Sequence, residues 1–231
     1  KEKARITVSA KRTFEAASRY KNTKTAVHNF ASASNPGGGV ERGANAQEEC
    51  LCRCSGLFKC LNAPDAWSGF YMAHRAEHNP IHNDDIIYTP DVLVFKSDTV
   101  KPELMDEADW YTVDVITCAA PNLREKPSNA FNTGDGKDAI KITDKDLLAI
   151  HEKRLRRILD VALSNKVETI VLGAFGCGAF MNNPNVVAQA SKNVVNKYLY
   201  AFKNIEFAVY CSPKDDTNYR IFDRVFRPYT K

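Results

Sequence analysis

Residues 167–184 read VETIVLGAFGCGAFMNNP and indicate the class of fold. The run from Thr169 to Phe175 is apolar throughout, which is typical of a strand in a sheet that helices cover on both faces. Glycines follow this strand, and Asn183 with Pro184 then supply the N-cap and the first-turn proline of a helix. A buried strand, a glycine loop and a helix in this order form one unit of an α/β domain.

The same alternation extends along the second half of the chain. We predict a strand over 113–121, a helix after the N-cap Thr143, a strand over 167–175, a helix over 184–202, a strand over 205–211 and a helix over 215–226. The helix after Thr143 carries an apolar face made of Leu148, His151, Leu155, Ile158, Leu159 and Ala162. This order predicts an α/β fold with a mixed β-sheet sandwiched between helices.

The first half of the chain adds further elements to the sheet. We predict strands over 5–11 and 25–32, helices over 12–20 and 45–61, and two short strands that form a hairpin within 86–96, around Thr89, Pro90 and Asp91. Residues 122–141 are polar and rich in glycine, so we expect a surface loop there. We interpret residues 1–231 as a single domain, because 44% apolar side chains suffice for one large core.

The composition argues against several classes of protein. The net charge of +4 is spread along the chain without a basic run, so it does not indicate a nucleic-acid partner. No apolar run approaches the roughly 20 residues that span a bilayer, and the first residues lack the apolar region of a secretory signal. We therefore expect a cytoplasmic protein that does not act at a membrane.

Four of the seven cysteines lie close together in the sequence, at Cys50, Cys52, Cys54 and Cys60. Their spacing matches none of the usual zinc motifs, and no histidine pair accompanies them. We weigh a zinc site against free thiols that pack on a helix, and we favour the thiols. An odd number of cysteines with no sign of secretion is consistent with a reducing cytoplasm. We expect no metal and no cofactor.

Two glycine loops follow strands that are remote in the sequence. The first contains Gly37, Gly38 and Gly39, and the second is the run from Gly173 to Phe180. Ligands of open α/β sheets bind at the carboxyl ends of the strands, where bare N–H groups form a site for anions. Tight turns are the alternative explanation, but two such loops favour a ligand that carries phosphate. Neither loop matches the P-loop or the GxGxxG fingerprint, which disfavours a kinase or a Rossmann dehydrogenase.

Glu48 and Glu49 begin the helix that follows the first glycine loop. The helix dipole favours acidic residues in a first turn, and this explains one of the two glutamates. Neighbouring helical residues point about 100° apart, so one carboxyl group can face a ligand hydroxyl and the other a leaving group. A diphosphate close by and partial burial both raise the pKa of a carboxyl group, as a general acid requires.

The spacing of the first loop and the glutamates resembles a family signature. Three glycines, seven residues and then Gln47-Glu48-Glu49 are similar to the GGG–QEE motif of poly(ADP-ribose) glycohydrolases. The segments YTPDVLVFKSD, VITCAAPN and VETIVLGAFGCGAFMNNP resemble the microbial-type branch of that family, in the same order. The resemblance covers nearly the whole chain. It implies a macrodomain, in which ADP-ribose binds at the carboxyl edge of a mixed sheet.

The resemblance also implies roles for particular residues. Glu49 would be the catalytic acid, Glu48 would hold the ribose next to the scissile bond, and Gln47 would help to position the loop. Asn35 with Gly37, Gly38 and Gly39 would surround the diphosphate and the distal ribose, and Gly176, Cys177 and Gly178 would form the second diphosphate loop. Phe180 would pack on the distal ribose. Tyr210 would stack on adenine, with a core aromatic as the equal alternative. The first strand offers no aspartate for reading adenine.

By this resemblance the protein is a glycosidase. It would cleave the ribose–ribose O-glycosidic bonds of poly(ADP-ribose) and release ADP-ribose, with Glu49 as general acid and base. A mono(ADP-ribosyl) hydrolase acting on protein or nucleic-acid adducts is one alternative. A non-catalytic module that binds ADP-ribose is another, which the two intact glutamates argue against. The expected partners are poly(ADP-ribose) or ADP-ribosylated macromolecules, and we expect a monomer.

Overall fold

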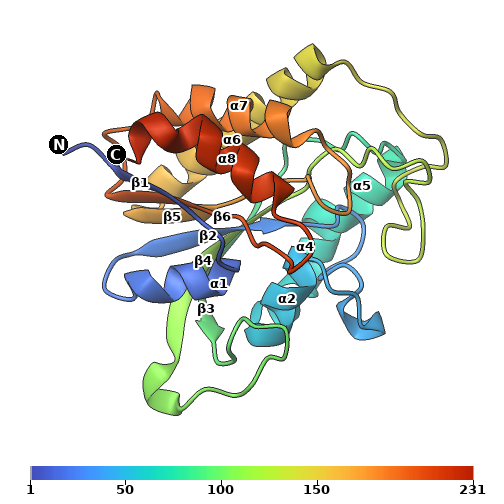
Figure 1. The fold of residues 1–231 in the computed structure, drawn as a ribbon. Coiled ribbons are helices and arrows are strands. Elements are labelled where there is room, and N and C mark those ends of the chain that lie inside the picture. The colour runs from blue at the N-terminus through green and yellow to red at the C-terminus, as the bar shows by residue number, and fades with distance from the viewer. Residues whose placement is uncertain (1, 231) are drawn as a thin grey trace.

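The computed structural model describes residues 2–230, and these residues form a six-stranded sheet between helices (Figure 1). The predicted single domain, 1–231, includes two terminal residues that lie outside this range. The strands are β1 (Arg5–Ser9), β2 (Thr25–Phe30), β3 (Ile87–Val94), β4 (Tyr111–Cys118), β5 (Thr169–Leu172) and β6 (Asn204–Ala208). Their order across the sheet is β1-β6-β5-β2-β4-β3. β3 runs antiparallel to β4 at the edge and the other pairs are parallel, so the sheet is mixed, as predicted.

Short helices fill the first half of the chain, and longer ones fill the second half. The helices are α1 (Thr13–Ala17), α2 (Gln47–Cys54), α3 (Leu57–Leu61), α4 (Pro64–Ala66), α5 (Met72–Glu77), α6 (Asp144–Ser164), α7 (Pro184–Val195) and α8 (Thr217–Phe226). Single turns of other helix types are η1 (Ser18–Tyr20), η2 (Val40–Arg42), η3 (Trp67–Tyr71), η4 (Glu107–Asp109) and η5 (Arg227–Tyr229). Within residues 2–230, no helix has the length and apolar character needed to cross a bilayer.

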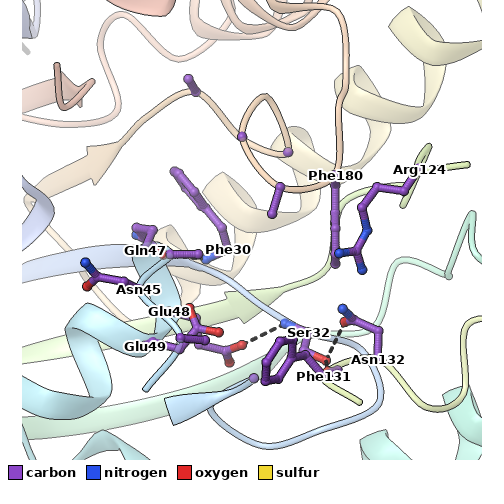
Figure 2. A pocket seen from close by; sticks show the side chains of 17 residues that line it. Phe30, Ser32, Asn45, Gln47, Glu48, Glu49, Arg124, Phe131, Asn132 and Phe180 are labelled. Carbon is purple, nitrogen blue, oxygen red and sulfur yellow. Dashed lines mark hydrogen bonds between the residues drawn. The ribbon is translucent and has the colours of Figure 1, made fainter. Parts of the chain in front are cut away.

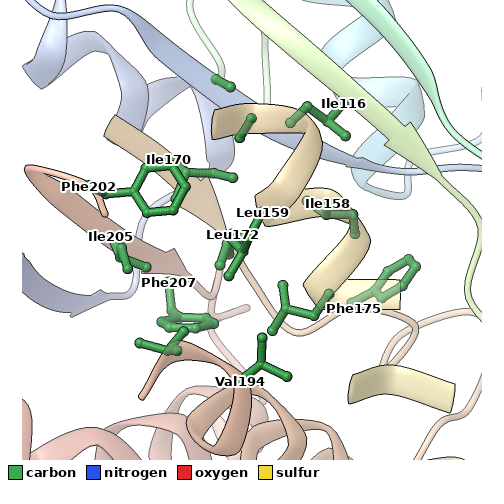
Figure 3. Packing of buried hydrophobic residues seen from close by; sticks show 14 of the residues in the cluster. Ile116, Ile158, Leu159, Ile170, Leu172, Phe175, Val194, Phe202, Ile205 and Phe207 are labelled. Atoms are coloured by element: carbon green, nitrogen blue, oxygen red, sulfur yellow. The ribbon is translucent and has the colours of Figure 1, made fainter. Parts of the chain in front are cut away.

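The sheet separates two hydrophobic cores. Because successive side chains of a strand point to opposite faces, Ile170 and Leu172 of β5 enter one core while Val171 enters the other. The first core packs the sheet against α6, α7 and α8. Figure 3 shows part of it, with Ile158 and Leu159 of α6, Val194 of α7 and Phe207 of β6. The second core packs the other face against α1, α2 and α3. Helices therefore cover both faces of the sheet, as the apolar strands predict.

The predicted βαβαβα order of the second half is confirmed, together with both helix caps. The Thr143 hydroxyl accepts a hydrogen bond from the Asp146 N–H at 3.1 Å, and Asn183 Oδ1 accepts one from the Asn185 N–H at 3.1 Å. These bonds satisfy N–H groups that have no partner within the helix. Residues 122–141 contain no helix or strand, in agreement with the predicted loop.

Two predicted helices have the wrong extent. The helix predicted over 184–202 ends at Val195, because the N–H groups of Lys197 and Tyr198 bond three residues back and tighten the chain into turns. The helix predicted over 45–61 is interrupted after Cys54. There Ser55 is extended and bridges to Val94, which splits the segment into α2 and α3.

The predicted hairpin within 86–96 is also wrong, because this segment forms the single strand β3. Its pairing with β4 shifts between Thr89 and Val92, so Pro90 and Asp91 lie in a bulge that needs no ladder bond from the proline. Asp114 of β4 stabilises the bulge. Its carboxylate accepts hydrogen bonds from the Asp91 N–H at 3.0 Å and from the Tyr88 hydroxyl at 2.5 Å.

Candidate active site

A cavity of about 220 Å³ lies at the carboxyl edge of the sheet, between the two glycine loops (Figure 2). We call it the central cavity. The predicted site residues that line it are Gly38, Gln47, Glu48, Glu49, Gly176, Gly178 and Phe180. Figure 2 shows Glu48 and Glu49 on one side of the cavity and Phe180 on the other. The fold therefore brings together segments that are more than a hundred residues apart.

The first glycine loop is shaped by close approach to its neighbours. Gly37 and Gly38 have φ angles of 64° and 57°, which residues with side chains rarely adopt. A β-carbon on Gly38 would lie 2.5 Å from Glu49 Oε1, and one on Gly39 would lie 2.4 Å from the ring of Phe131. Glycine is thus required at Gly38 both by the backbone and by the carboxyl group packed against it.

Glu48 is buried, with 2% of its surface exposed, and both of its oxygens accept hydrogen bonds. Oε1 accepts from Asn29 Nδ2 at 3.1 Å, and Oε2 accepts from the Ser32 N–H at 2.7 Å. Burial raises the pKa of Glu48 to about 8, and the nearby Glu49 carboxylate adds to this rise. The Ser32 N–H opposes the rise without cancelling it. Glu48 is therefore largely neutral at pH 7.

Glu49 is 6% exposed and differs from Glu48 in its contacts. Its Oε1 accepts a hydrogen bond from the Gly39 N–H at 2.9 Å. Its Oε2 is buried and has no hydrogen-bond partner among residues 2–230. A buried carboxylate oxygen is costly to leave unpaired, so this atom is available for a ligand group.

Gln47 attaches the start of α2 to the end of β2. Its Oε1 accepts a hydrogen bond from the Phe30 N–H at 2.9 Å, and its Nε2 donates to the His28 carbonyl at 2.8 Å and to Thr13 Oγ1 at 3.0 Å. All of the polar atoms of this side chain are therefore engaged by the protein. These bonds fix the helix turn that carries the two glutamates.

The second glycine loop is held by a buried asparagine that the sequence analysis did not identify. Asn182 Nδ2 donates to the carbonyls of Pro121 at 2.7 Å, Gly176 at 3.1 Å and Phe180 at 3.1 Å. Its Oδ1 lies 2.8 Å from His151 Nε2. Burial lowers the pKa of His151 to about 4, so this histidine is neutral at pH 7 and donates to Asn182 through Nε2.

Five of the predicted site residues do not line the central cavity, namely Asn35, Gly37, Gly39, Cys177 and Tyr210, of which Tyr210 lines a neighbouring cavity. Gly37 packs against Phe58, and a β-carbon on Gly37 would lie 2.8 Å from the Phe58 ring. Cys177 packs against the hydrophobic core of α6, α7 and α8, and burial raises the pKa of its thiol. Asn35 lies on the outer side of the loop, where its Oδ1 accepts hydrogen bonds from Arg75 Nη2 at 2.5 Å and Thr133 Oγ1 at 3.3 Å.

The 122–141 loop contributes Arg124, Phe131 and Asn132 to the central cavity, although no local sequence pattern marks any of them. Asn132 lies 2.9 Å from the Ser32 hydroxyl (Figure 2). With the amide nitrogen turned toward Ser32, the amide oxygen accepts from Arg124 Nη2 at 2.8 Å, so we assign this orientation. The Arg124 guanidinium lies 5.6 Å from the centre of the Phe180 ring. No carboxylate of residues 2–230 lies within 4.0 Å of it.

A buried cluster fixes the base of this loop. Asp135 Oδ2 accepts a hydrogen bond from Asn122 Nδ2 at 2.7 Å and lies 3.2 Å from His82 Nε2. The other ring nitrogen of His82 lies 2.7 Å from the Ala120 carbonyl, just beyond β4. The loop is therefore attached to the carboxyl edge of the sheet, although it contains no regular structure of its own.

A second cavity, of about 310 Å³, continues the cleft toward β6. We call it the Tyr210 cavity, and it shares Phe30, Gln47 and Gly178 with the central cavity. Tyr210 is 44% exposed, and the Arg12 guanidinium lies 4.1 Å from the centre of its ring. Asp98 lines the same cavity, and its Oδ1 has no hydrogen-bond partner among the described residues. Asp98 belongs to a loop after β3, distant in the sequence from the first strand.

The clustered cysteines are dispersed over the faces of α2 and α3. Cys50, Cys52 and Cys54 are buried and Cys60 is exposed, and all four are free thiols. Within residues 2–230, no group of three or more histidine, cysteine, aspartate or glutamate side chains is arranged to hold a metal ion.

The sheet order and the cleft with its pair of carboxyl groups define an α/β protein of the macrodomain type. A family model described as the microbial-type PARG catalytic domain matches residues 1–97. A crystal structure of poly(ADP-ribose) glycohydrolase from Thermomonospora curvata, bound to the inhibitor ADP-HPD, is 32% identical with a TM-score of 0.81. That comparison covers 96% of this chain and 78% of the other.

A second similar structure is poly(ADP-ribose) glycohydrolase from Deinococcus radiodurans in complex with ADP-ribose. It is 33% identical with a TM-score of 0.83, over 98% of this chain and 86% of the other. A comparison with curated protein sequences finds no match. The chain belongs to the microbial-type poly(ADP-ribose) glycohydrolase family. The predicted family, fold class and class of enzyme are confirmed.

Proposed function

We propose that the protein hydrolyses the ribose–ribose O-glycosidic bonds of poly(ADP-ribose) with Glu49 as the general acid and base. One observation carries the assignment. Glu49 has a buried Oε2 without a hydrogen-bond partner at the central cavity, whereas both oxygens of Glu48 already accept hydrogen bonds. A group that transfers a proton to and from a ligand needs such a free oxygen within reach of the reacting atoms.

The binding mode follows from the two cavities. We place the diphosphate of ADP-ribose between the two glycine loops, where backbone N–H groups and the Arg124 guanidinium offer favourable charge. The distal ribose then packs against Phe180, and adenine lies in the cavity beside Tyr210. The complexes of the Deinococcus radiodurans and Thermomonospora curvata relatives with ADP-ribose and ADP-HPD support a nucleotide-sized ligand in this cleft.

The reaction needs one proton donor that later acts as a base. Protonated Glu49 gives its proton to the leaving ribose oxygen while the bond from this oxygen to the anomeric carbon breaks, and the ring develops oxocarbenium character. The bound diphosphate stabilises the positive charge. The Glu49 carboxylate then takes a proton from water, whose oxygen bonds to the anomeric carbon. The products are free ADP-ribose and a polymer end with a free hydroxyl.

We assign Glu48 to positioning rather than to proton transfer. Its raised pKa also suits a proton donor, but Asn29 and Ser32 already direct N–H groups at its two oxygens. These contacts fix the carboxyl group beside the loop, where a neutral acid can hydrogen-bond a ribose hydroxyl without repelling the diphosphate.

The test is the substitution Glu49→Gln, which removes the proton and keeps the shape. We expect a loss of poly(ADP-ribose) hydrolysis of at least about 100- to 10,000-fold, because general acid–base catalysis contributes on that order. ADP-ribose binding, measured by calorimetry, should persist. Glu168→Gln, at the opposite end of β5, is the matched control and should keep the parental rate.

Hydrolysis at the parental rate by Glu49→Gln would refute the assignment of the acid. A parent protein that binds ADP-ribose but releases none from the polymer would instead support the non-catalytic alternative. Release from mono(ADP-ribosyl)ated protein or nucleic acid, with no attack on the polymer, would support the mono(ADP-ribosyl) hydrolase.

We also infer that the protein acts as a monomer in the cytoplasm. All seven cysteines are free thiols, including the exposed Cys60, which is consistent with a reducing compartment.

A further inference from the structure

A third cavity, of about 270 Å³, lies on the outer side of the first glycine loop. We call it the outer cavity. Its wall is made by the loop, by η2, by the segment from α3 to α5 and by the tip of the 122–141 loop, and includes Gly38, Glu41, Arg42, Trp67, Arg75 and Thr133. Apart from Gly38 and Gly39 of the glycine loop, its residues make no contact with ADP-ribose in the proposed binding mode.

Two arginines give the outer cavity positive charge. Arg75 is held in place, since its Nε donates to the Ser34 carbonyl at 2.7 Å and its guanidinium lies 4.6 Å from the centre of the Trp67 ring. Arg42 is exposed and donates from Nη1 to the Ala130 carbonyl at 3.0 Å. No carboxylate of residues 2–230 lies within 4.0 Å of either guanidinium, although Glu41 lines the same cavity. Both arginines therefore keep charge and N–H groups for an anion.

The outer cavity adjoins the catalytic end of the cleft. Gly38 lines both the outer and the central cavity, whereas the Tyr210 cavity shares no residue with the outer one. The order along the cleft is therefore Tyr210 cavity, central cavity and outer cavity. Glu49 packs against Gly38, and the backbone at Gly38 lies between the central cavity and the outer cavity. An ADP-ribose unit that extends from Tyr210 to Glu49 directs whatever is attached to its anomeric carbon toward the outer cavity.

We propose that the outer cavity binds the neighbouring ADP-ribose unit of the polymer, which is the leaving group, through its diphosphate on Arg42 and Arg75. The proposal rests on the proposed function, because it needs the anomeric carbon to lie at Glu49. A polymer unit fits this site better than a protein acceptor does. Each polymer unit carries two negative charges near the bond that breaks, together with a base that can contact the aromatic edge of Trp67.

The experiment removes the charge of two adjacent residues in turn, the positive Arg42 and the negative Glu41. Arg42→Gln should raise KM for poly(ADP-ribose) by about three- to tenfold at low ionic strength, since an exposed charge contributes less than a buried one. Glu41→Gln should lower this KM. Both variants should keep the parental affinity for ADP-ribose and the parental rate on an ADP-ribose derivative whose anomeric carbon bears a small fluorogenic alcohol. Arg42→Lys should recover part of the polymer affinity.

Arg157→Gln is the control, because it removes an exposed arginine from α6 and should change none of these values. Equal losses on the polymer and on the small substrate in Arg42→Gln, or a weaker polymer affinity in Glu41→Gln, would overturn the proposal. An equal loss on a mono(ADP-ribosyl)ated peptide would overturn it in favour of a protein acceptor. Failure of the proposed function is distinct, because it would abolish ADP-ribose binding or hydrolysis of the small substrate in the parent.

Discussion

Glu48 and Glu49 are neighbours in the sequence, but their surroundings in the fold differ. Glu48 turns toward β2 and receives N–H groups from Asn29 and Ser32, while Glu49 turns toward the glycine loop and keeps one oxygen unpaired. The 100° step between helical neighbours produces this separation. The unpaired oxygen of Glu49 at the central cavity supports its proposed role as the group that transfers the proton.

The raised pKa of Glu48 predicts a pH-dependent stability. Its folded pKa of about 8 exceeds the ordinary 4.5, so its contribution to stability is complete below pH 4.5 and is lost as the pH rises through 8. Replacing it by Glu48→Gln should remove this loss. Between pH 5 and pH 8.5, we expect the parental Tm to fall by roughly 10 °C more than that of the variant in thermal unfolding, because each unit between the folded and the ordinary pKa is worth about 1.4 kcal/mol. Parallel Tm profiles for the two proteins would contradict the raised pKa.

At the scale of elements, the conformations of the two glycine loops are fixed by different contacts. Side chains packed against its glycines shape the first loop, and hydrogen bonds from one side chain shape the second. Asn182 joins the end of β4 to the loop after β5 and is supported from α6 by His151. The second loop therefore depends on contacts from the end of β4 and from α6 as well as on its own Gly176, whose φ angle is 75°.

Asn182→Ala should open the second loop. It removes four hydrogen bonds and leaves the Pro121 carbonyl and His151 Nε2 without these partners, at a cost of about 2–4 kcal/mol in the free energy of unfolding. ADP-ribose affinity should fall by more than about tenfold, because the loop N–H groups lose their arrangement. Calorimetry and urea unfolding measure the two effects. Asn185→Ala, at an exposed position of α7, is the control, and equal behaviour of both variants would argue against this role.

At the scale of the whole molecule, the cleft is completed by a loop without regular structure. The tip of the 122–141 segment places Phe131 on Gly39 and Asn132 beside Ser32, while its base is attached through Asp135 to Asn122 and His82. The loop therefore behaves as a fixed wall, and the sheet alone would leave the central cavity open on one side.

Asp135→Ala should release this wall. We expect faster cleavage within residues 122–141 during limited proteolysis and a weaker affinity for ADP-ribose, because Arg124 and Phe131 lose their fixed positions. Asp138→Ala, at an exposed position of the same loop, is the control for a general effect of substitutions in this loop. Proteolysis at the parental rate in Asp135→Ala would show that other contacts hold the loop.

Local patterns in the sequence are sufficient to predict the order of strands and helices in residues 113–226, with the N-caps of α6 and α7, and to single out the two glycine loops and the glutamate pair. These features depend on neighbours within a few positions, so periodicity and backbone preference reveal them. The bulge in β3 and the break after Cys54 were missed, because each depends on a residue of another segment, Asp114 in one case and Val94 in the other.

Long-range contacts account for the rest of the candidate site. Arg124, Phe131 and Asn132 reach the central cavity because Asp135 meets His82, and Asp98 reaches the Tyr210 cavity from a loop after β3. The pKa of Glu48 likewise depends on how completely the fold removes water from it. Burial and hydrogen bonding between distant segments exist only once the chain is folded, so no local pattern encodes them.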